Sequence, residues 1–223
     1  MKYEETVRAL FLKRKNRFVA QVELDGTLLD VHVKNTGRCR ELLVPGNAVI
    51  LSRADNPKRK TPYDLVAVYR GNGRLFNMDS QAPNAVTGEW LKSLNIFDEI
   101  RPEYTIGDSR FDFHMIRDGR EHLLEVKGCT LVREDGIGYF PDAPTERGVK
   151  HLKELAELSG RGYRCSVAFV IQTEGVYKVL PNMETHPAFG EALEAAAGAG
   201  VEIRCLPCRV WEDRLEIAPG TAW

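Results

Sequence analysis

The chain has 223 residues, of which 43% are hydrophobic and 28% are charged, and its formal net charge is −1. This length allows one large domain or two smaller ones, and either can bury a proper core. A net charge near zero excludes a chain that is basic throughout, so any nucleic-acid partner has to be argued from local charge.

The charge is unevenly distributed along the chain. Residues 1–60 hold 13 Lys and Arg against 7 Asp and Glu, whereas residues 61–223 hold 18 against 25. The N-terminal part is therefore a basic module, which argues for an anionic partner but not for a particular fold.

Cysteine usage and the first residues bear on the compartment. The five cysteines have no regular spacing, and no N-terminal apolar segment could serve as a signal peptide or membrane anchor. We expect a cytoplasmic protein without membrane association. Cys205-Leu-Pro-Cys208 lacks the second pair that a zinc site needs, so we interpret it as two structural thiols, with a redox or half-metal role as the alternative.

Residues 6–69 contain short apolar or alternating runs that are typical of β-strands. The expected strands are 7–12, 18–24, 28–33, 48–51 and 65–69, with turn signals at 25–26, 35–37 and 56–57 between them. Five short strands predict a small barrel, and a five-stranded Greek-key barrel is the OB-fold, which frequently binds oligonucleotides.

Basic residues recur in the loops of this predicted barrel. Loop-borne cations beside aromatic rings suit contacts to phosphates and stacking on bases, although a solvated rim is the alternative. In the turn at 35–37, Asn and Gly adopt positive φ easily and present backbone N–H groups to an anion, or they form a plain turn. The candidate nucleic-acid-binding residues here are Lys13, Arg14, Arg17, Asn35, Arg38, Lys58, Arg59 and Lys60.

A change of pattern near residue 80 predicts two domains, residues 1–80 and 81–223. The second contains helical patterns at 84–94, 145–160 and 187–199, and apolar runs typical of strands at 97–106, 166–171, 176–180 and 201–206. The run 166–171 is continuously apolar, as a strand buried on both faces should be. This mixed order predicts helices covering a mixed sheet, hence an α+β or α/β domain.

Residues 110–127 predict a β-hairpin around Asp118-Gly119, because a type I′ turn needs positive φ at both central positions. If Arg117 and Arg120 close the turn, counting back along both strands places Asp112 across from Glu125. Lys127 then lies on the same face as Glu125, since side chains alternate along a strand. The opposite, core-facing side would carry Phe111, Phe113, Leu124 and Val126.

Two facing carboxylates repel each other unless a cation lies between them. Asp112 and Glu125 are therefore the candidate ligands of a divalent ion such as Mg²⁺ or Mn²⁺, and Lys127 is the candidate ammonium that orients water or stabilises charge. An ordinary exposed Glu–Lys pair is the alternative. Glu89 and Glu103 are candidates for a third acidic ligand.

The helix expected to begin at Asp142 or Thr145 carries Arg147 and Lys150 near its first turn. Free amides and a partial positive charge at a helix N-terminus suit a phosphate, so both residues join the nucleic-acid-binding candidates. Ordinary helix-surface charge is the alternative.

Several sequence words resemble the sugar fermentation stimulation protein A (SfsA) family, and they span nearly the whole chain in order. The matching words are Leu10-Phe-Leu-Lys-Arg14, Arg17-Phe18, Asn35-Thr-Gly37, Pro45-Gly46, Asn56-Pro-Lys-Arg-Lys-Thr-Pro-Tyr63, Pro83-Asn84, Arg110-Phe-Asp-Phe113, Glu125-Val-Lys127, Phe140-Pro-Asp-Ala-Pro-Thr-Glu-Arg-Gly148 and Lys150-His-Leu152.

The resemblance implies an N-terminal OB-like domain and a C-terminal restriction-endonuclease-like domain of the PD-(D/E)XK class. It puts the nuclease motif on Asp112, Glu125 and Lys127, although Phe111 occupies the place of the motif's proline. It also implies DNA binding, single- or double-stranded, and a link to the regulation of sugar metabolism, notably of maltose. The oligomeric state is left open, a homodimer included.

Three functions follow as hypotheses. The first is a DNA-binding protein with a metal-dependent phosphodiester hydrolase site. The second is a DNA-binding regulator that does not cleave, and the third is an RNA or small-molecule phosphodiesterase that uses the same site.

Overall fold

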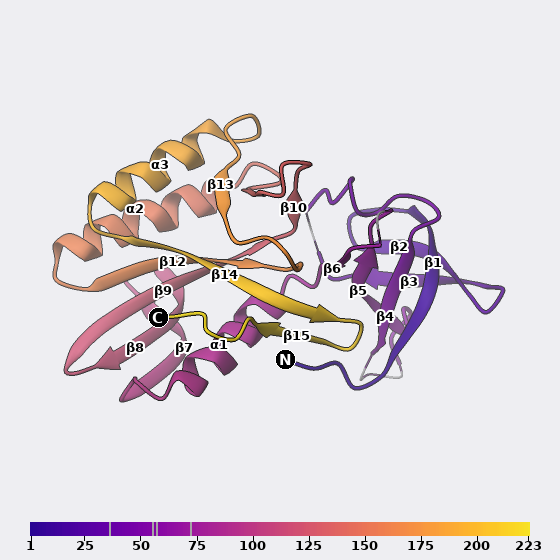
Figure 1. Ribbon diagram of the computed structural model, residues 1–223, viewed down its shortest axis with the longest axis horizontal. Helices are drawn as coiled ribbons and strands as arrows, with labels where there is room; N and C mark the ends of the chain where they lie inside the picture. Colours follow the sequence, from indigo (N-terminus) through magenta and orange to yellow (C-terminus); the bar gives the residue numbers. More distant parts are fainter. Residues whose placement is uncertain (36, 55, 57, 72) are drawn as a thin grey trace.

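The computed structural model describes residues 1–35, 37–54, 56, 58–71 and 73–223. A β-barrel and a layered α/β domain lie side by side along its longest axis (Figure 1). The turns expected at 35–37 and 56–57 include Thr36 and Pro57, which lie outside the described residues. In the described part of the chain, no helix is long and apolar enough to cross a membrane.

The N-terminal domain is the five-stranded OB barrel that the sequence predicted. Its strands are β1 (Thr6–Arg14), β2 (Val19–Leu24), β3 (Thr27–Val33), β4 (Ala48–Arg53) and β5 (Tyr63–Tyr69). They are ordered β3-β2-β1-β4-β5, and a parallel pairing of β3 with β5 closes the barrel. A short sixth strand, β6 (Leu75–Asn77), was not predicted; it pairs with β5 and leads into the second domain.

The C-terminal domain is built on a mixed sheet, as predicted, and this sheet has six strands. The sheet contains β7 (Glu99–Ile106), β8 (Ser109–Arg117), β9 (Arg120–Cys129), β12 (Arg164–Ile171), β14 (Glu202–Trp211) and β15 (Arg214–Ile217), and a smaller sheet contains β10 (Leu131–Val132), β11 (Gly138–Phe140) and β13 (Val179–Pro181). The order is β15-β14-β12-β9-β8-β7, in which β9, β12 and β14 are parallel and the outer pairs are antiparallel.

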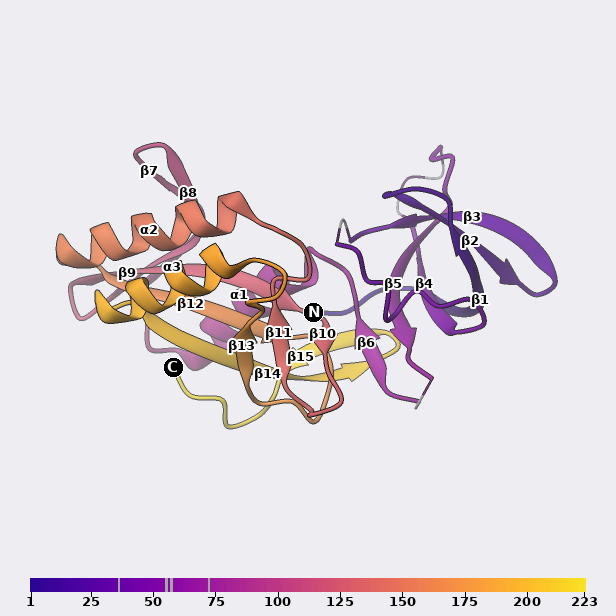
Figure 2. The ribbon, with the colours of Figure 1, turned by 90° about the horizontal axis from the view of Figure 1, so that it is seen from above.

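Helices cover both faces of this sheet (Figure 2). On one face, α2 (Glu146–Gly160) and α3 (Pro187–Gly198) contribute Leu152, Leu155 and Phe189 to the cluster that contains Val167 and Phe169 of β12. On the other, α1 (Ala82–Leu94) packs into a second cluster. Residues 165–171 are all buried, which is why the central strand is continuously apolar.

Helix α2 begins where the sequence places a cap. The Thr145 hydroxyl accepts a hydrogen bond from the Gly148 N–H at 3.1 Å, which satisfies one of the amides left free in the first turn. Of the two predicted caps, Thr145 is therefore the correct one, and Asp142 has another role, described below.

The β8–β9 hairpin has the predicted turn and register. Asp118 and Gly119 have φ of 51° and 69°, as a type I′ turn requires, and pairing runs from Arg117 with Arg120 to Phe113 with Leu124. Beyond Phe113 the pairing stops, because the Asp112 carboxylate accepts the Val126 N–H at 2.7 Å.

The predicted face of Phe111 is wrong. Phe113 and Leu124 pack against α1, but Phe111 belongs to the cluster under α2, with its ring 5.9 Å from that of His151. Glu103, on the neighbouring strand β7, has a φ of 54°, so the pleat is irregular here and simple alternation fails.

The end of the chain also departs from the prediction. Strand β14 continues past Pro207 and turns into β15, neither of which the sequence pattern indicated. Pro207 is the last residue of β14 that pairs with β12, and the pairing with β15 begins at Cys208. Cys205 and Cys208 are both free thiols within this strand.

A buried polar network joins the two domains. Asp79, 1% exposed, accepts hydrogen bonds from the Tyr3 hydroxyl at 3.2 Å and the Gln81 N–H at 2.9 Å, and pairs with Lys34 at 2.8 Å. Gln172 of the C-terminal domain donates to the Asp79 carbonyl at 3.0 Å. Burial and the Asp79 charge together raise the pKa of the Tyr3 phenol, which keeps it a donor.

We expect Asp79→Ala to lower the free energy of unfolding by about 3 kcal/mol, because it leaves the half-buried Lys34 and the buried Tyr3 without their acceptor. Urea denaturation measures this. Asp213→Ala is the control, since its exposed pair with Lys2 at 3.7 Å is worth less than about 1 kcal/mol. Equal losses in the two variants would contradict the assigned importance of the network.

Candidate metal and nucleic-acid site

Glu125 on β9 is the centre of the predicted site and is only 3% exposed. Its Oε1 accepts hydrogen bonds from the Lys127 ammonium and from His151 Nδ1, both at 2.5 Å. Its Oε2 is buried and has no hydrogen-bond partner among the residues that the structure describes. One oxygen is therefore held by the protein, while the other is left for a ligand.

Asp112 on β8 is half-buried, and both of its oxygens are held. Oδ1 accepts from the Asn84 side chain of α1 at 2.7 Å, and Oδ2 accepts the Val126 N–H at 2.7 Å. Each oxygen keeps a further lone pair for a cation.

The two carboxylates titrate in opposite directions. Burial and then the negative charge of Glu125 raise the pKa of Asp112. Burial acts to raise the pKa of Glu125 too, but His151 and Lys127 outweigh it and hold that pKa below its ordinary value. Glu125 is thus the member that ionises more readily, and a cation near its Oε2 would also favour the ionised form of Asp112.

His151 on α2 is a site residue to which the sequence analysis assigned no role. It is 4% exposed, and its Nε2 accepts from Arg147 Nε at 3.3 Å while Nδ1 faces Glu125. The neutral Nδ1–H tautomer satisfies both contacts. The available signal was its spacing four residues after Arg147, which puts both on one helix face.

The donor set fits a hard divalent cation. Mg²⁺ is commonly bound through one or two carboxylates, with water and phosphate oxygens completing its shell. Asp112 and Glu125 supply two carboxylates, and in the described part of the chain no group of three or more His, Cys, Asp and Glu side chains could hold a metal ion. A protein-only cage of the kind found in structural zinc sites is therefore not the pattern here.

The two candidates for a third acidic ligand lie elsewhere. Glu89 forms an ion pair with the Met1 amino group at 2.5 Å, and Glu103 lies 3.5 Å from Arg110 with its side chain 69% exposed. Asn84, which contacts Asp112 from α1, is the polar side chain that this helix brings to the site.

The predicted nucleic-acid-binding residues of the barrel divide into three groups. Arg14 donates to the carbonyl oxygens of Arg17, Asn35, Gly37 and Arg38, and Asn35 bonds to the Met78 carbonyl and the Gly37 N–H. These two brace the loop. The others, apart from Arg59, are exposed: Lys13, Arg17, Arg38, Lys58 and Lys60.

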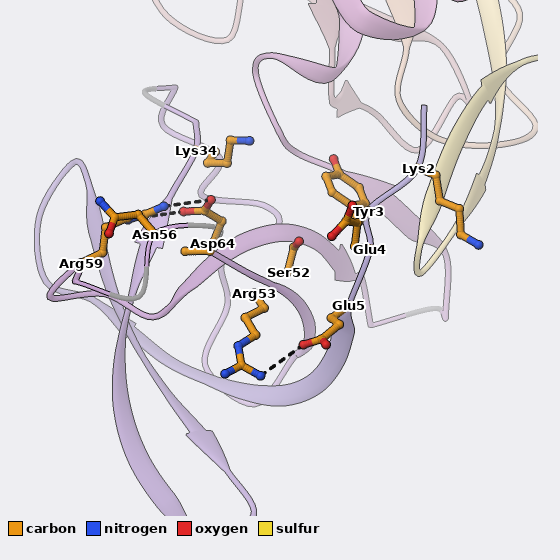
Figure 3. Close-up of a pocket in the computed structure, with 11 residues that line it drawn as sticks. Lys2, Tyr3, Glu4, Glu5, Lys34, Ser52, Arg53, Asn56, Arg59 and Asp64 are labelled. Carbon is orange, nitrogen blue, oxygen red and sulfur yellow. Dashed lines mark hydrogen bonds and ion pairs between the residues drawn. The ribbon is translucent and has the colours of Figure 1, made fainter.

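Arg59 lines a cavity of about 580 Å³ on the barrel (Figure 3). Its guanidinium binds both oxygens of Asp64, at 2.7 and 3.2 Å, and across the same cavity Arg53 pairs with Glu5. The cavity therefore mixes both charge signs, and the exposed neighbours Lys58 and Lys60 carry the excess positive charge of this loop.

A second cavity, of about 320 Å³, lies between the two domains. Arg17, Asn35 and Gly37 line it from the barrel, and Gly128, directly after Lys127, lines it from β9. Asp142 accepts the Arg38 N–H at 3.1 Å across this junction. Arg147 and Lys150 are exposed on the first turn of α2, after the loop that forms the cavity wall.

Comparisons with known proteins agree with this architecture. A family model described as the SfsA N-terminal OB domain matches residues 12–77, and one described as the sugar fermentation stimulation protein RE domain matches residues 81–214. Curated relatives named sugar fermentation stimulation protein homolog include those of Desulfitobacterium hafniense, 52% identical over 219 residues, and Ruminiclostridium cellulolyticum, 47% identical over 220 residues. The alignments cover 97% of this chain and 95% and 96% of the relatives.

A solved structure, described as Pyrococcus furiosus SfsA in complex with Ca²⁺, superposes with a TM-score of 0.84 at 28% identity. The superposition covers 97% of this chain and 95% of that one. The two chains thus share the arrangement of both domains and not only the fold of one.

The lowered pKa of Glu125 predicts how its contribution to stability depends on pH. Its ordinary pKa is 4.5, so the stabilisation is fully present above that value and is lost as pH falls below 4.5 towards the lowered pKa of the folded state. In urea denaturation we expect the loss of stability in Glu125→Gln to be greatest above about pH 5.5 and to shrink on acidification.

Glu157→Gln removes an exposed carboxylate from the same helix as His151 and controls for net charge, with an expected change under about 0.5 kcal/mol. A difference between wild type and Glu125→Gln that grows as pH falls would contradict the sign of the shift.

Proposed function

The chain belongs to the sugar fermentation stimulation protein A family, and on that premise we propose that it is a DNA-binding protein with a divalent-metal-dependent phosphodiester hydrolase site. The observation that carries the proposal is the buried carboxylate of Glu125, with Oε1 shared by Lys127 and His151 and with Oε2 unpartnered in the described part of the chain.

The residues that would hold Mg²⁺ or Mn²⁺ are Asp112 and Glu125. A buried carboxylate oxygen without a partner is costly unless a cation or donor approaches it, and a hard cation prefers such oxygens. The Ca²⁺ in the description of the Pyrococcus furiosus relative supports divalent-ion binding by the family. When bound, such an ion polarises the phosphoryl group and lowers the pKa of a coordinated water.

The protein's own groups prepare this chemistry. The Lys127 side chain is 15% exposed. Its ammonium donates one hydrogen bond to Glu125 and has further N–H donors for a water or a phosphate oxygen. His151 holds Glu125 Oε1 from α2 and, because Arg147 donates a hydrogen bond to it, acts as a positioning residue. Asn84 and the Val126 amide fix Asp112 in the same way.

The nucleic acid would run from the barrel loops across the interdomain cavity to Glu125. Exposed Lys13, Arg17, Arg38, Lys58 and Lys60, with Arg147 and Lys150 on α2, supply phosphate contacts. In this proposal Arg14 and Asn35 shape the loop and Arg59 orders its own loop through Asp64. An action on DNA would also provide the route to a role in sugar metabolism, maltose metabolism included.

We expect the protein to cleave single- or double-stranded DNA with Mg²⁺ or Mn²⁺ and to be inactive with a chelator. Lys127→Met and Glu125→Gln should each lower the cleavage rate by about 10²-fold or more, since both remove groups that act on the developing charge. The measurement is single-turnover cleavage of end-labelled strands. Metal binding, followed by calorimetry without DNA, should be lost in Glu125→Gln but kept in Lys127→Met.

Lys153→Met is the matched control, because it removes an exposed ammonium from α2 without approaching Glu125. DNA binding without cleavage under every metal condition would overturn the hydrolase and favour the regulator. Cleavage restricted to RNA or to small phosphodiesters would retain the site but replace the substrate.

DNA affinity should fall steeply with salt concentration. Each neutralised phosphate contributes a slope of about −0.7 to −0.9 in a log–log plot, so Lys58→Gln combined with Lys60→Gln should flatten the slope by about 1.5. Fluorescence anisotropy at several salt concentrations measures this. As a control, Lys92→Gln combined with Lys153→Gln removes the same amount of charge at positions outside the proposed path. An equal change of slope in this control would contradict DNA binding by the loop that carries Lys58 and Lys60.

A further inference from the structure

A third cavity, of about 550 Å³, lies at the amino-terminal ends of the parallel strands. It is lined by four arginines, one histidine and a tryptophan, among other residues: Arg117, Arg120, Arg164, Arg204, His122 and Trp223. We call it the arginine cavity. None of these residues takes part in the proposed hydrolase site.

Strand register explains why these side chains converge. His122 of β9 pairs directly with Arg164 of β12, and side chains two residues further along, Leu124 and Ser166, are again paired. Leu124 packs against α1, so His122 and Arg164 share the α1 face of the sheet, because alternate residues face the same side. Glu125, one residue after Leu124, points to the opposite face.

The arginine cavity has an excess of positive charge. Arg117 pairs with Asp118 at 3.6 Å and Arg204 pairs with Glu202. For Arg120 and Arg164, the structure records no ion pair within the described part of the chain. Two guanidinium groups are therefore left uncompensated at one cavity.

The pKa of His122 also responds to the positive charge of these arginines. Burial is the largest cause that lowers its pKa, and the charges of Arg117, Arg164 and Arg204 lower it further, although Glu202, the largest effect after burial, acts in the opposite direction. The ring is accordingly neutral near pH 7, so it can donate or accept a hydrogen bond without adding to the charge.

One guanidinium of the cavity is held in place before any ligand arrives. Arg204 lies 4.2 Å above the Trp223 ring and is tied to Glu202, and its Nε is buried without a partner among the described residues. Trp223 is itself fixed by an edge-on contact with Phe97 at 5.0 Å. Fixing a guanidinium in advance lowers the entropic cost of binding an anion.

We propose that the arginine cavity binds a small phosphorylated molecule, whose phosphate is held by Arg120, Arg164 and Arg204. Guanidinium groups bind phosphate oxygens in a bidentate, charge-assisted manner, and a dianionic phosphate balances the two uncompensated arginines.

The position of the cavity argues against nucleic acid as its occupant. The β8–β9 turn and the C-terminal segment lie at the end of the sheet away from the barrel (Figure 1). A strand that runs between the barrel and Glu125 stays at the other end and on the other face. The inference is therefore independent of the hydrolase proposal.

The test is a titration of the full chain with pyrophosphate and with ADP, in the absence of divalent metal, followed by calorimetry and tryptophan fluorescence. We expect saturable binding that changes the emission, and about a tenfold or greater loss of affinity in Arg164→Gln. Arg161→Gln removes an exposed arginine just after α2, outside the cavity, and should bind like wild type. Trp223→Phe should lose most of the fluorescence change and keep the heat of binding.

Three results would overturn the proposal. They are an absence of saturable binding, an equal loss of affinity in Arg161→Gln and Arg164→Gln, and unchanged affinity in Arg164→Gln. If only a 5′-phosphorylated oligonucleotide binds in an Arg164-dependent manner, the cavity is a nucleic-acid contact and the small-molecule assignment is wrong.

Discussion

The burial of the Glu125 carboxylate is the constraint on which the C-terminal domain depends. An ionised carboxylate that is almost excluded from water is unfavourable by several kcal/mol unless charged or hydrogen-bonded partners compensate it. Lys127 provides one partner from the same strand, and His151 provides the other from α2, which must therefore dock in one rotational setting. The helix that covers this face of the sheet therefore also completes the environment of the carboxylate.

A second constraint acts where the barrel meets the sheet. A Cβ atom on Gly37 would lie 2.3 Å from the Asp142 carboxylate, and one on Gly128 would lie 2.4 Å from Gln172 Oε1. A side chain at either position would force these neighbours to shift, so glycine is what lets the barrel loop and the end of β9 approach them as they do. Arg14 holds that loop through hydrogen bonds to four carbonyl groups, so its guanidinium fixes the shape of the loop.

Local signals in the sequence were sufficient for much of this arrangement. Asp118-Gly119 defined a turn and hence a register, which placed Asp112 and Glu125 on adjacent strands, and the five barrel strands followed from alternation and turn residues. The failures involve contacts between distant residues. His151 reaches Glu125 from 26 residues away, which no strand period reveals. Phe111 changes face because Asp112 bonds to a backbone amide and β7 bends at Glu103, and both are tertiary effects. The hairpin of β14 and β15 was hidden because a proline interrupts its pattern.

The Glu125 carboxylate and the arginine cavity lie on opposite faces of one sheet, and their separation bears on how they can influence each other. Arg164 pairs with His122 and Val167 pairs with Glu125, so the two are three residues apart along β12, or roughly 10 Å at about 3.3 Å per residue. That is close to the Debye length of about 8 Å at physiological salt, and screening is weaker through protein than through water. An anion in the arginine cavity would thus repel the Glu125 carboxylate through the sheet. A second route for coupling is packing along β12, whose buried side chains contact α1 on one face and α2 on the other. A shift of this strand would move Val167 and Phe169 against the helix that carries His151, and so would change the hydrogen bond on which Glu125 depends.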